Sequence, residues 1–247
     1  MRGLPRQLAV ALATLYNLVV NGLAGAGLLF GVDTGAISDS LATGVTPAGA
    51  AFSIWGLIFF GTLVFAVWQA RPAARGARYD ALAVPFIAAN LLNGTWQLVW
   101  LNRLFGPSVV VIFALLASLV WLYVRLDRLA MTTAERWALG VPVALWLAWI
   151  TVAAPVNATA WLYALGWTDG TVWAPVLVGV VAAIGAALLA RTGDVAFAGV
   201  IVWAFAWIAV RHTAVPLRVV LLLGGLAVVA ATALAIRRGR SPLPVTS

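Results

Sequence analysis

The stretch that decides the fold is residues 107–124, which read PSVVVIFALLASLVWLYV and contain no charged side chain. About 20 apolar residues in a helix cross the roughly 30 Å hydrocarbon core of a bilayer, so this stretch predicts a transmembrane helix. Seven further runs of the same character lie at 8–30, 49–69, 82–102, 137–163, 172–190, 195–211 and 216–236. The sequence therefore predicts an all-α integral membrane protein with about eight transmembrane helices.

The composition excludes a water-soluble domain. The 247 residues are 64% hydrophobic and 9% charged, whereas ordinary globular domains are roughly 25% charged. The formal net charge is +8, but there is no lysine and the arginines are scattered at the ends of the apolar runs. Because no basic face forms, we expect the lipid bilayer as the partner of this chain and no nucleic acid.

The arginines also predict the orientation, since cytoplasmic loops of membrane proteins are enriched in basic residues. With the N-terminus inside, twelve arginines face the cytoplasm and three face out. The inner set is Arg2, Arg6, Arg71, Arg75, Arg78, Arg125, Arg128, Arg136, Arg191, Arg237, Arg238 and Arg240, and the outer set is Arg103, Arg211 and Arg218. We expect a multi-pass protein of the cell membrane with both termini cytoplasmic.

No pattern typical of an enzyme is visible. The chain has no cysteine, and its single histidine, His212, lies at the end of an apolar run, where we interpret it as an interfacial residue. Prolines such as Pro85 are expected in the first turn of their helices, where the missing N–H costs nothing. The acidic residues Asp127 and Glu135 share one predicted loop with Arg125, Arg128 and Arg136, which favours a salt-bridged surface loop. We expect neither a catalytic residue nor a metal site.

Amide side chains are concentrated in the third run. Asn90, Asn93 and Gln97 recur at intervals of three and four, which places them on one face of a helix. Lipid cannot hydrogen-bond an amide, so such groups face other helices or a cavity. In the first run, Asn17 and Asn21 are also one turn apart and indicate helix contacts. For this reason we expect the first run to remain in the protein rather than to be a cleaved signal peptide.

Tryptophan is abundant and unevenly placed. Of 13 tryptophans, eight fall in the predicted outer half: Trp55, Trp96, Trp100, Trp161, Trp167, Trp173, Trp203 and Trp207. Aromatic walls with a few fixed polar groups are typical of small-molecule sites, so a pocket that opens outward is one interpretation. A belt at the membrane interface and amides that join helices are the alternatives. The first outer loop, about 31–47, is either a lid over such a pocket or a solvated linker.

Three segments carry a resemblance to a known family. Residues 46–55 (TPAGAAFSIW) resemble the entry to helix two of the TspO/MBR proteins, which are also called tryptophan-rich sensory proteins or translocator proteins. Asn93 to Trp96 (NGTW) resembles their helix-three motif, and residues 149–157 (WITVAAPVN) resemble a segment of their helix five. The resemblance covers roughly residues 8–163. It implies a five-helix bundle that binds porphyrin-like or sterol-like ligands.

The resemblance also implies roles for individual residues. Trp55 and Asn93 would contact the ligand, Trp149 and Ala153 would form the helix-five wall, and Asn157 would be a structural asparagine. Together with the amide stripe, the candidate ligand-binding residues are Trp55, Asn90, Asn93, Trp96, Gln97, Trp100, Trp149, Ala153, Asn157 and Trp161. The family usually has tryptophans where this chain has Thr46, Gly49 and Ala50, and a second asparagine where it has Tyr163.

The resulting hypothesis is a membrane protein that binds an apolar small molecule, tetrapyrrole-, sterol- or lipid-like, as a sensor, carrier or scavenger. A membrane-embedded enzyme that acts on a bound tetrapyrrole and a small-molecule transporter are the alternatives. A porphyrin or haem-like ligand is compatible with the first, no cofactor is required, and a homodimer is left open. The expected organisation is a bundle over 1–163, three added helices packed on it over 164–237, and a cytoplasmic tail over 238–247.

Overall fold

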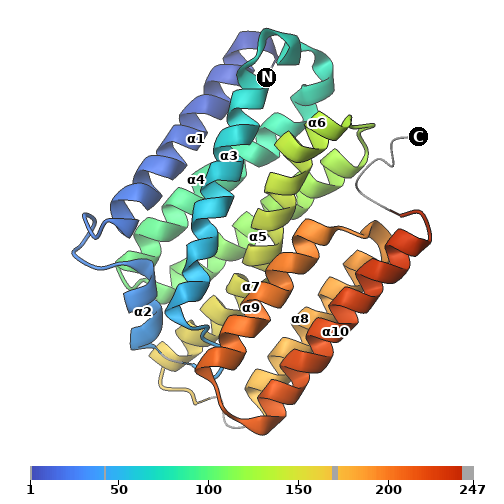
Figure 1. Cartoon of the computed structure of the whole chain (residues 1–247). Coiled ribbons are helices and arrows are strands. Elements are labelled where there is room, and N and C mark those ends of the chain that lie inside the picture. The colour runs from blue at the N-terminus through green and yellow to red at the C-terminus, as the bar shows by residue number, and fades with distance from the viewer. Residues whose placement is uncertain (1, 42, 169–171, 241–247) are drawn as a thin grey trace. The chain divides into compact units, whose positions relative to one another are not determined.

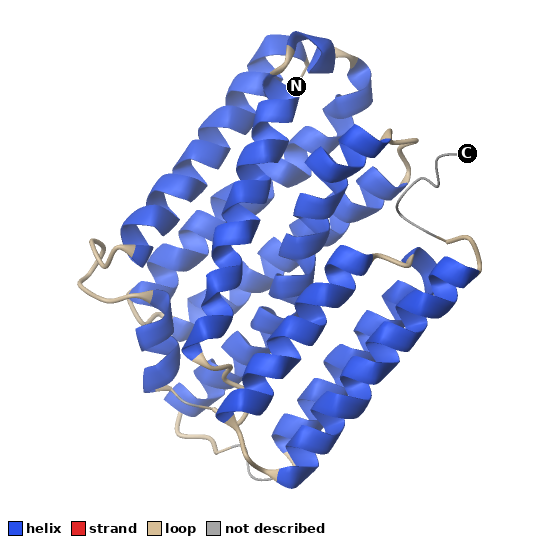
Figure 2. Cartoon of the chain, in the orientation of Figure 1, coloured by secondary structure: helices blue, strands red, loops and turns tan. Residues whose placement is uncertain are grey.

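The structure, a computed structural model, describes residues 2–41, 43–168 and 172–240. Helices joined by loops make up this part of the chain, without any strand (Figures 1 and 2). Seven helical stretches are long and apolar enough to cross a membrane, and the 17-residue helix α9 is also apolar but shorter. The main helices of these stretches are α1 (Gly3–Gly25), α3 (Ile54–Ala70), α4 (Asp80–Leu101), α5 (Phe105–Asp127), α7 (Val141–Ala164), α8 (Trp173–Thr192) and α10 (Val215–Arg237), and the shorter α9 comprises Val195–Arg211. The predicted all-α, multi-pass membrane architecture is confirmed.

Short helical segments connect these spans. They are α2 (Thr34–Ser40), η1 (Gly49–Ser53), η2 (Pro72–Arg75), η3 (Ala77–Tyr79), α6 (Thr133–Glu135) and the π-helical turn η4 (Arg136–Gly140). Thr132 begins the stretch that leads into α7 with a capping box: its hydroxyl accepts a hydrogen bond from the backbone N–H of Glu135, whose carboxylate accepts one from the N–H of Thr132. Such reciprocal bonds satisfy donors that the first turn of a helix leaves free.

The compact units of the chain do not follow the order of the sequence. One unit consists of the residues up to Ile37 together with Ile54–Leu147, and the other of Ser38–Ser53 together with the residues from Ala148 onward. In the first unit, α1 packs against α3 and α4, and α4 packs against α5 (Figure 1). In the second, α10 packs against α8 and α9, and η1 packs against α9. The predicted boundary at residue 163, between a five-helix bundle and three added helices, stays a prediction. Residues 241–247 of the predicted tail lie outside the described part of the chain.

Two predicted helix positions differ from the structure. The first span begins at Gly3 rather than at residue 8, and the chain turns after Gly25, where Gly27 and Phe30 adopt positive φ angles. Pro85 lies inside α4 rather than in its first turn, because that helix already begins at Asp80. Both helices start earlier than predicted because Arg6 and Asp80 take part in their first turns, which a search for apolar runs does not detect.

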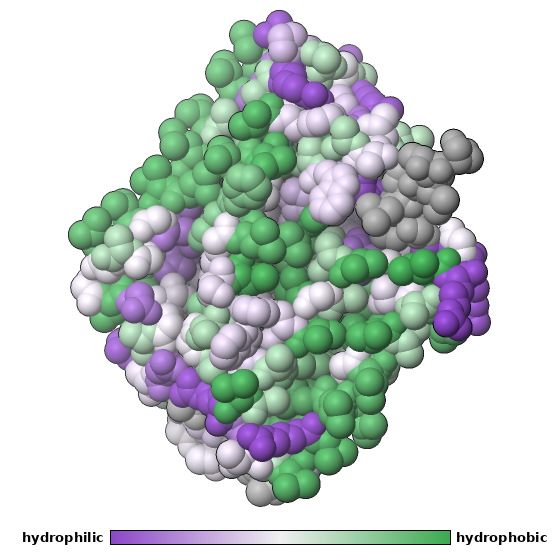
Figure 3. All heavy atoms as spheres, viewed as in Figure 1, coloured by the Kyte–Doolittle hydropathy of each residue, from purple (hydrophilic) through white to green (hydrophobic). Residues whose placement is uncertain are grey.

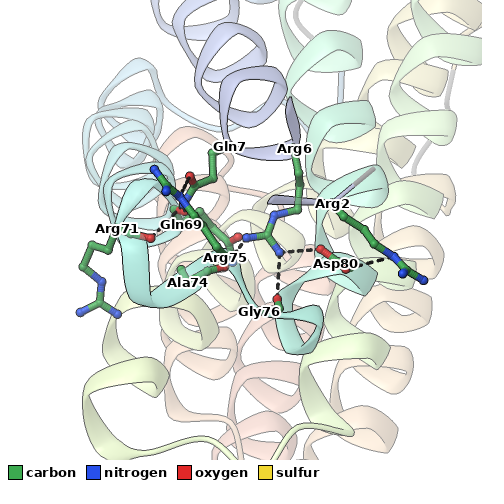
Figure 4. A network of polar contacts seen from close by, with 9 residues as sticks. All are labelled: Arg2, Arg6, Gln7, Gln69, Arg71, Ala74, Arg75, Gly76 and Asp80. Carbon is green, nitrogen blue, oxygen red and sulfur yellow. Dashed lines mark hydrogen bonds and ion pairs between the residues drawn. The ribbon is translucent and has the colours of Figure 1, made fainter. Parts of the chain in front are cut away.

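The start of α1 is fixed by a buried polar network (Figure 4). The side chain of Arg6 is fully buried and donates hydrogen bonds to Asp80 (2.8 Å), to the carbonyl oxygen of Ala74 and to that of Gly76 (3.4 Å). Next to it, the Gln7 amide donates to the carbonyl oxygens of Gln69 (2.7 Å) and Arg71 (2.8 Å). A charged residue can therefore lie inside the first span, since a carboxylate and two backbone carbonyl oxygens accept hydrogen bonds from its two terminal nitrogens.

The predicted salt-bridged loop around residue 135 is wrong in its pairing. Glu135 is buried and pairs with Arg78 from the other loop (3.0 Å), and it also accepts a hydrogen bond from the hydroxyl of Tyr79 (2.5 Å). Arg78 additionally donates to the carbonyl oxygen of Ala130. This carboxylate therefore ties the loop before α4 to the start of the stretch that leads into α7.

Candidate ligand site

The amide stripe of α4 is bonded to α1. Asn17 is fully buried on α1, and its side-chain amide donates a hydrogen bond to Oδ1 of Asn90 (3.0 Å). Oδ1 of Asn17 accepts two hydrogen bonds, from Asn93 (2.8 Å) and from Asn21 (2.8 Å). The predicted helix contact of Asn17 is confirmed, and Asn90 and Asn93 join α1 to α4. Asn21 instead bonds to Asn17 within α1.

One acceptor atom of this cluster of asparagines has no hydrogen-bond partner. Oδ1 of Asn93 is buried and has no hydrogen-bond partner among the described residues. Asn90, by contrast, also donates to the carbonyl oxygen of Phe86 one turn earlier (2.9 Å). An unpaired buried acceptor is costly, about 1–3 kcal/mol, so Asn93 is the member of the stripe best suited to accept a hydrogen bond from a ligand.

The aromatic end of the stripe contacts the segment that follows α1. Trp96 and Trp100 lie one turn apart, with ring centroids 5.6 Å apart and nearly parallel planes. The Gln97 amide donates to the hydroxyl of Thr34 (2.5 Å), and the indole N–H of Trp100 donates to the carbonyl oxygen of the same residue (3.3 Å). The polar face of α4 is thus covered by α1 at one end and by the start of α2 at the other.

In the second unit, the segment 38–53 is fastened to α9 along most of its length. Arg211 at the end of α9 forms an ion pair with Asp39, and a ring nitrogen of His212 lies 2.9 Å from the carbonyl oxygen of Thr46. The backbone N–H of Ala48 donates to the carbonyl oxygen of Trp207 (3.1 Å). The indole N–H of Trp203 donates to the carbonyl oxygen of Ala51 (3.1 Å). We call residues 38–53 the strap.

The strap also meets helix α7. The ring of Phe52 lies edge-on to that of Trp149, with centroids 6.1 Å apart. Trp149 is buried, Ala153 one turn later is half-buried, and Asn157 is buried, whereas Trp161 is more exposed, at 37%. Strap and α7 therefore share an aromatic pair that is followed on α7 by a small side chain. We call Phe52, Trp149 and Ala153 the aromatic wall.

The candidate residues are divided between the two units. Trp55, Asn90, Asn93, Trp96, Gln97 and Trp100 belong to the first unit, and Trp149, Ala153, Asn157 and Trp161 to the second. Trp55 stacks on Phe59 in its own helix, with centroids 5.1 Å apart. That the two groups line one cavity stays a prediction.

Comparison with known proteins decides the family. A family model described as TSPO-like protein matches residues 7–236. The chain belongs to the TSPO-like protein family. No curated protein and no solved structure matches it. The family match begins at Gln7 and continues to Ile236, so the TSPO-like region includes α8, α9 and α10, whereas the sequence motifs extended only to about residue 163.

Sequence reasoning missed the anchors of the strap in this TSPO-like chain. His212 was expected to be an interfacial residue, and Arg211 was read only as a marker of orientation. Both residues also contact the strap. The available signal was that Asp39 and Arg211 have opposite charges and were predicted to lie on the same side of the membrane. Opposite charges at one surface are candidates for pairing, but 172 residues separate these two.

Proposed function

We propose that this TSPO-like membrane protein binds an apolar small molecule, tetrapyrrole-, sterol- or lipid-like, and acts as its sensor, carrier or scavenger. The observation that carries the proposal is the strap. It includes most of the segment 46–55, on which the resemblance to TspO/MBR proteins rests, and it is held in place by contacts to α9. Phe52 is thereby fixed against Trp149.

An aromatic wall that is already held in place binds a ligand more tightly than a mobile loop with the same side chains would. A loop that must become ordered around its ligand loses conformational freedom on binding, and this loss weakens the affinity. Here the backbone at Ala48 and Ala51 is already held by Trp207 and Trp203. The proposal assigns ligand contacts, and no catalytic step, to this wall in the second unit and, independently of it, to the free acceptor of Asn93 in the first unit.

The orientation belongs to the same proposal. The arginine distribution favours cytoplasmic termini and a strap on the outer side. The natural chain has no cysteine, so a single cysteine at Arg75 or Arg103 can be labelled alone. With a membrane-impermeant reagent added outside intact cells, we expect labelling at position 103 and none at 75. The reverse pattern would refute the orientation.

The binding proposal is tested with protoporphyrin and the purified protein in detergent. The absorbance of the porphyrin is the readout, because it is independent of the protein's own tryptophans. We expect Trp149→Ala and Asn93→Ala each to weaken binding by about tenfold, the effect of losing roughly 1.4 kcal/mol of contact free energy. Trp121→Ala is the control, because that ring is 44% exposed on α5.

A second control separates ligand contact from helix packing. Asn17 bonds to Asn90 and Asn93 but is not a candidate ligand contact. We expect Asn17→Ala to lower the thermal midpoint at least as much as Asn93→Ala does, yet to leave porphyrin affinity nearly unchanged. Equal affinities for the natural protein and for the Trp149 and Asn93 variants would overturn the site. Light-dependent loss of the porphyrin would instead indicate an enzyme, and flux into liposomes a transporter.

A further inference from the structure

A groove runs along the second unit between α9 and α10, and none of its lining residues belongs to the strap or to α7. Its volume is about 330 Å³. Every lining side chain is apolar except that of Arg218, near the start of α10. From α9 the groove is lined by Val202, Phe205, Ala206 and Ala209, and from α10 by Arg218, Leu221, Leu222, Gly225, Leu226 and Val229.

Small residues create the groove. Ala206 and Ala209 lie on its α9 side and Gly225 on its α10 side, and a Cβ atom added at Gly225 would meet no other atom within 4 Å. The neighbouring Gly224 is different, because a Cβ there would approach Ala182 to 2.8 Å and Phe205 to 3.1 Å. Gly224 therefore allows close helix packing, whereas Gly225 leaves space open on the outer face.

The length of the groove matches one leaflet of a bilayer. Arg218 and Val229 are eleven residues apart, which corresponds to about 16 Å along a helix. One half of the hydrocarbon core measures roughly 15 Å. Because α10 begins at Val215, Arg218 lies in the first turn of the span, at the depth of the interface, and the apolar part of the groove extends from there into the membrane.

The charge at the end of the groove has no counter-ion. Arg218 forms no ion pair within the described part of the chain, whereas Arg211 is paired with Asp39. Its guanidinium is positioned by hydrogen bonds to the carbonyl oxygens of His212 (2.8 Å) and Ala209 (3.2 Å), which use Nε and Nη2. Nη1 remains for an external acceptor. Figure 3 shows hydrophobic residues over α9 and α10, with hydrophilic groups at the helix ends.

From these observations we infer that the groove between α9 and α10 is a binding site for one anionic phospholipid. One acyl chain lies along the groove from Leu221 to Val229, and the phosphate accepts hydrogen bonds from Arg218. An arginine is suited to this task, because its guanidinium stays charged and its Nη1, which carries neither of the bonds to His212 and Ala209, can donate a charge-assisted hydrogen bond to a phosphate oxygen. The inference goes beyond the proposed function, since it concerns a different set of residues and a membrane phospholipid recognised by its charge.

The test uses the full chain in detergent, and bound lipid is counted by native mass spectrometry. The probes are dioleoyl phosphatidylglycerol, dioleoyl phosphatidylcholine, dioleoylglycerol, which lacks the phosphate, and glycerol phosphate, which lacks the chains. We expect one phosphatidylglycerol to bind more tightly than the other three. Gly225→Leu, which fills the groove, should weaken the binding of phosphatidylglycerol by about tenfold. This is the effect of losing the contacts of about two methylene groups. Arg218→Gln should abolish the preference over dioleoylglycerol, and Arg218→Lys should retain part of it.

The controls are matched to these variants. Gly199 is an exposed glycine on α9 outside the groove with no atom within 4 Å of an added Cβ, so Gly199→Leu should leave lipid binding unchanged. Arg191→Gln removes an arginine that does not line the groove and should do likewise. If Gly225→Leu lowers the thermal midpoint more than Gly199→Leu, Ala206→Leu replaces it as the groove-filling variant. Porphyrin affinity, measured in parallel, should not change in any groove variant, which keeps this inference separate from the proposed function.

Three outcomes would overturn the inference. Equal binding of phosphatidylglycerol and dioleoylglycerol to the natural protein would show that Arg218 does not recognise a headgroup. Equal lipid retention by the Gly225→Leu and Gly199→Leu proteins would place the lipid elsewhere. A change in oligomeric state caused by Gly225→Leu, without loss of lipid, would identify a second copy of the chain as the occupant.

Discussion

Two loops of this protein are each fastened to a helix by an arginine, but the two arginines differ in burial. Arg6 on α1 is 0% exposed and bonds to Asp80, whose side chain is 20% exposed. Arg211 at the end of α9 is 24% exposed and pairs with Asp39, which is 50% exposed. The first pair lies within a network that includes two backbone carbonyls, and the second lies at a surface.

The difference indicates which contacts hold each loop. Exposed ion pairs contribute about 0–1 kcal/mol, because water already solvates both charges well. Removing one partner of a buried pair costs about 3–5 kcal/mol, because the other groups lose their partner without gaining water. We therefore expect the Arg6 network to depend on its charge. The strap should depend mainly on its backbone contacts to Trp203 and Trp207.

The largest effect is expected for Arg6. Arg6→Met keeps most of the volume but removes the hydrogen bonds that Arg6 donates to Asp80 and to the carbonyl oxygens of Ala74 and Gly76. We expect the free energy of unfolding in detergent to fall by about 3 kcal/mol, the lower end for a buried pair, because Asp80 is partly exposed. Equilibrium denaturation with dodecyl sulfate measures it.

The control for this change lies four residues earlier. Arg2 approaches the same carboxylate to 3.9 Å, but its side chain is 92% exposed. Arg2→Met should change the free energy of unfolding by less than about 1 kcal/mol. If Arg2→Met and Arg6→Met had equal effects, burial would not be what distinguishes the two loops.

Much of the fold was predictable because lipid imposes a simple rule on sequence. The run 195–211 was predicted with the same bounds that α9 has, since Asp194 and Arg211 are charged residues at its two ends. Asp194 is also the N-cap, and it accepts hydrogen bonds from the N–H groups of Ala196 and Phe197 (both 3.1 Å). Where a charge marks the end of a helix, hydropathy and capping give the same boundary.

The candidate site was less predictable, because its contacts are long-range. The periodicity of Asn90, Asn93 and Gln97 correctly placed them on one face, but no local pattern named Asn17 and Thr34 as their partners. Arg6 was read as a charge before the first span, since hydropathy alone cannot show that Asp80 compensates it. Pairing across 63 to 76 residues follows from the packing of the helices rather than from local sequence.

An intermediate effect is expected for Trp203. Trp203→Phe retains an aromatic ring but removes the N–H that donates to Ala51, which is fully buried. The expected loss is about 0.5–1.5 kcal/mol in the free energy of unfolding, the usual net contribution of one hydrogen bond. Trp207→Phe is the matched control, because it contacts the strap through its backbone carbonyl, which the substitution keeps. Equal losses in the two variants would show that ring area, and not the bond, holds the strap.

The smallest effect is expected for Asp39, and it decides whether the strap depends on its ion pair. Asp39→Asn removes the charge that faces Arg211 but leaves the contacts of Thr46, Ala48 and Ala51 in place. We expect less than about 1 kcal/mol of destabilisation, and a smaller difference at 1 M salt, where charges are screened beyond roughly 3 Å. Hydrogen exchange of the Ala48 amide is the direct measurement, because this N–H bonds to Trp207 only while the strap is attached. Its protection should be nearly the same in the Asp39→Asn and natural proteins at low salt. Tenfold faster exchange in the variant, reproduced in the natural protein by high salt, would show that the surface ion pair holds the strap and that burial is the wrong criterion for comparing the two loops.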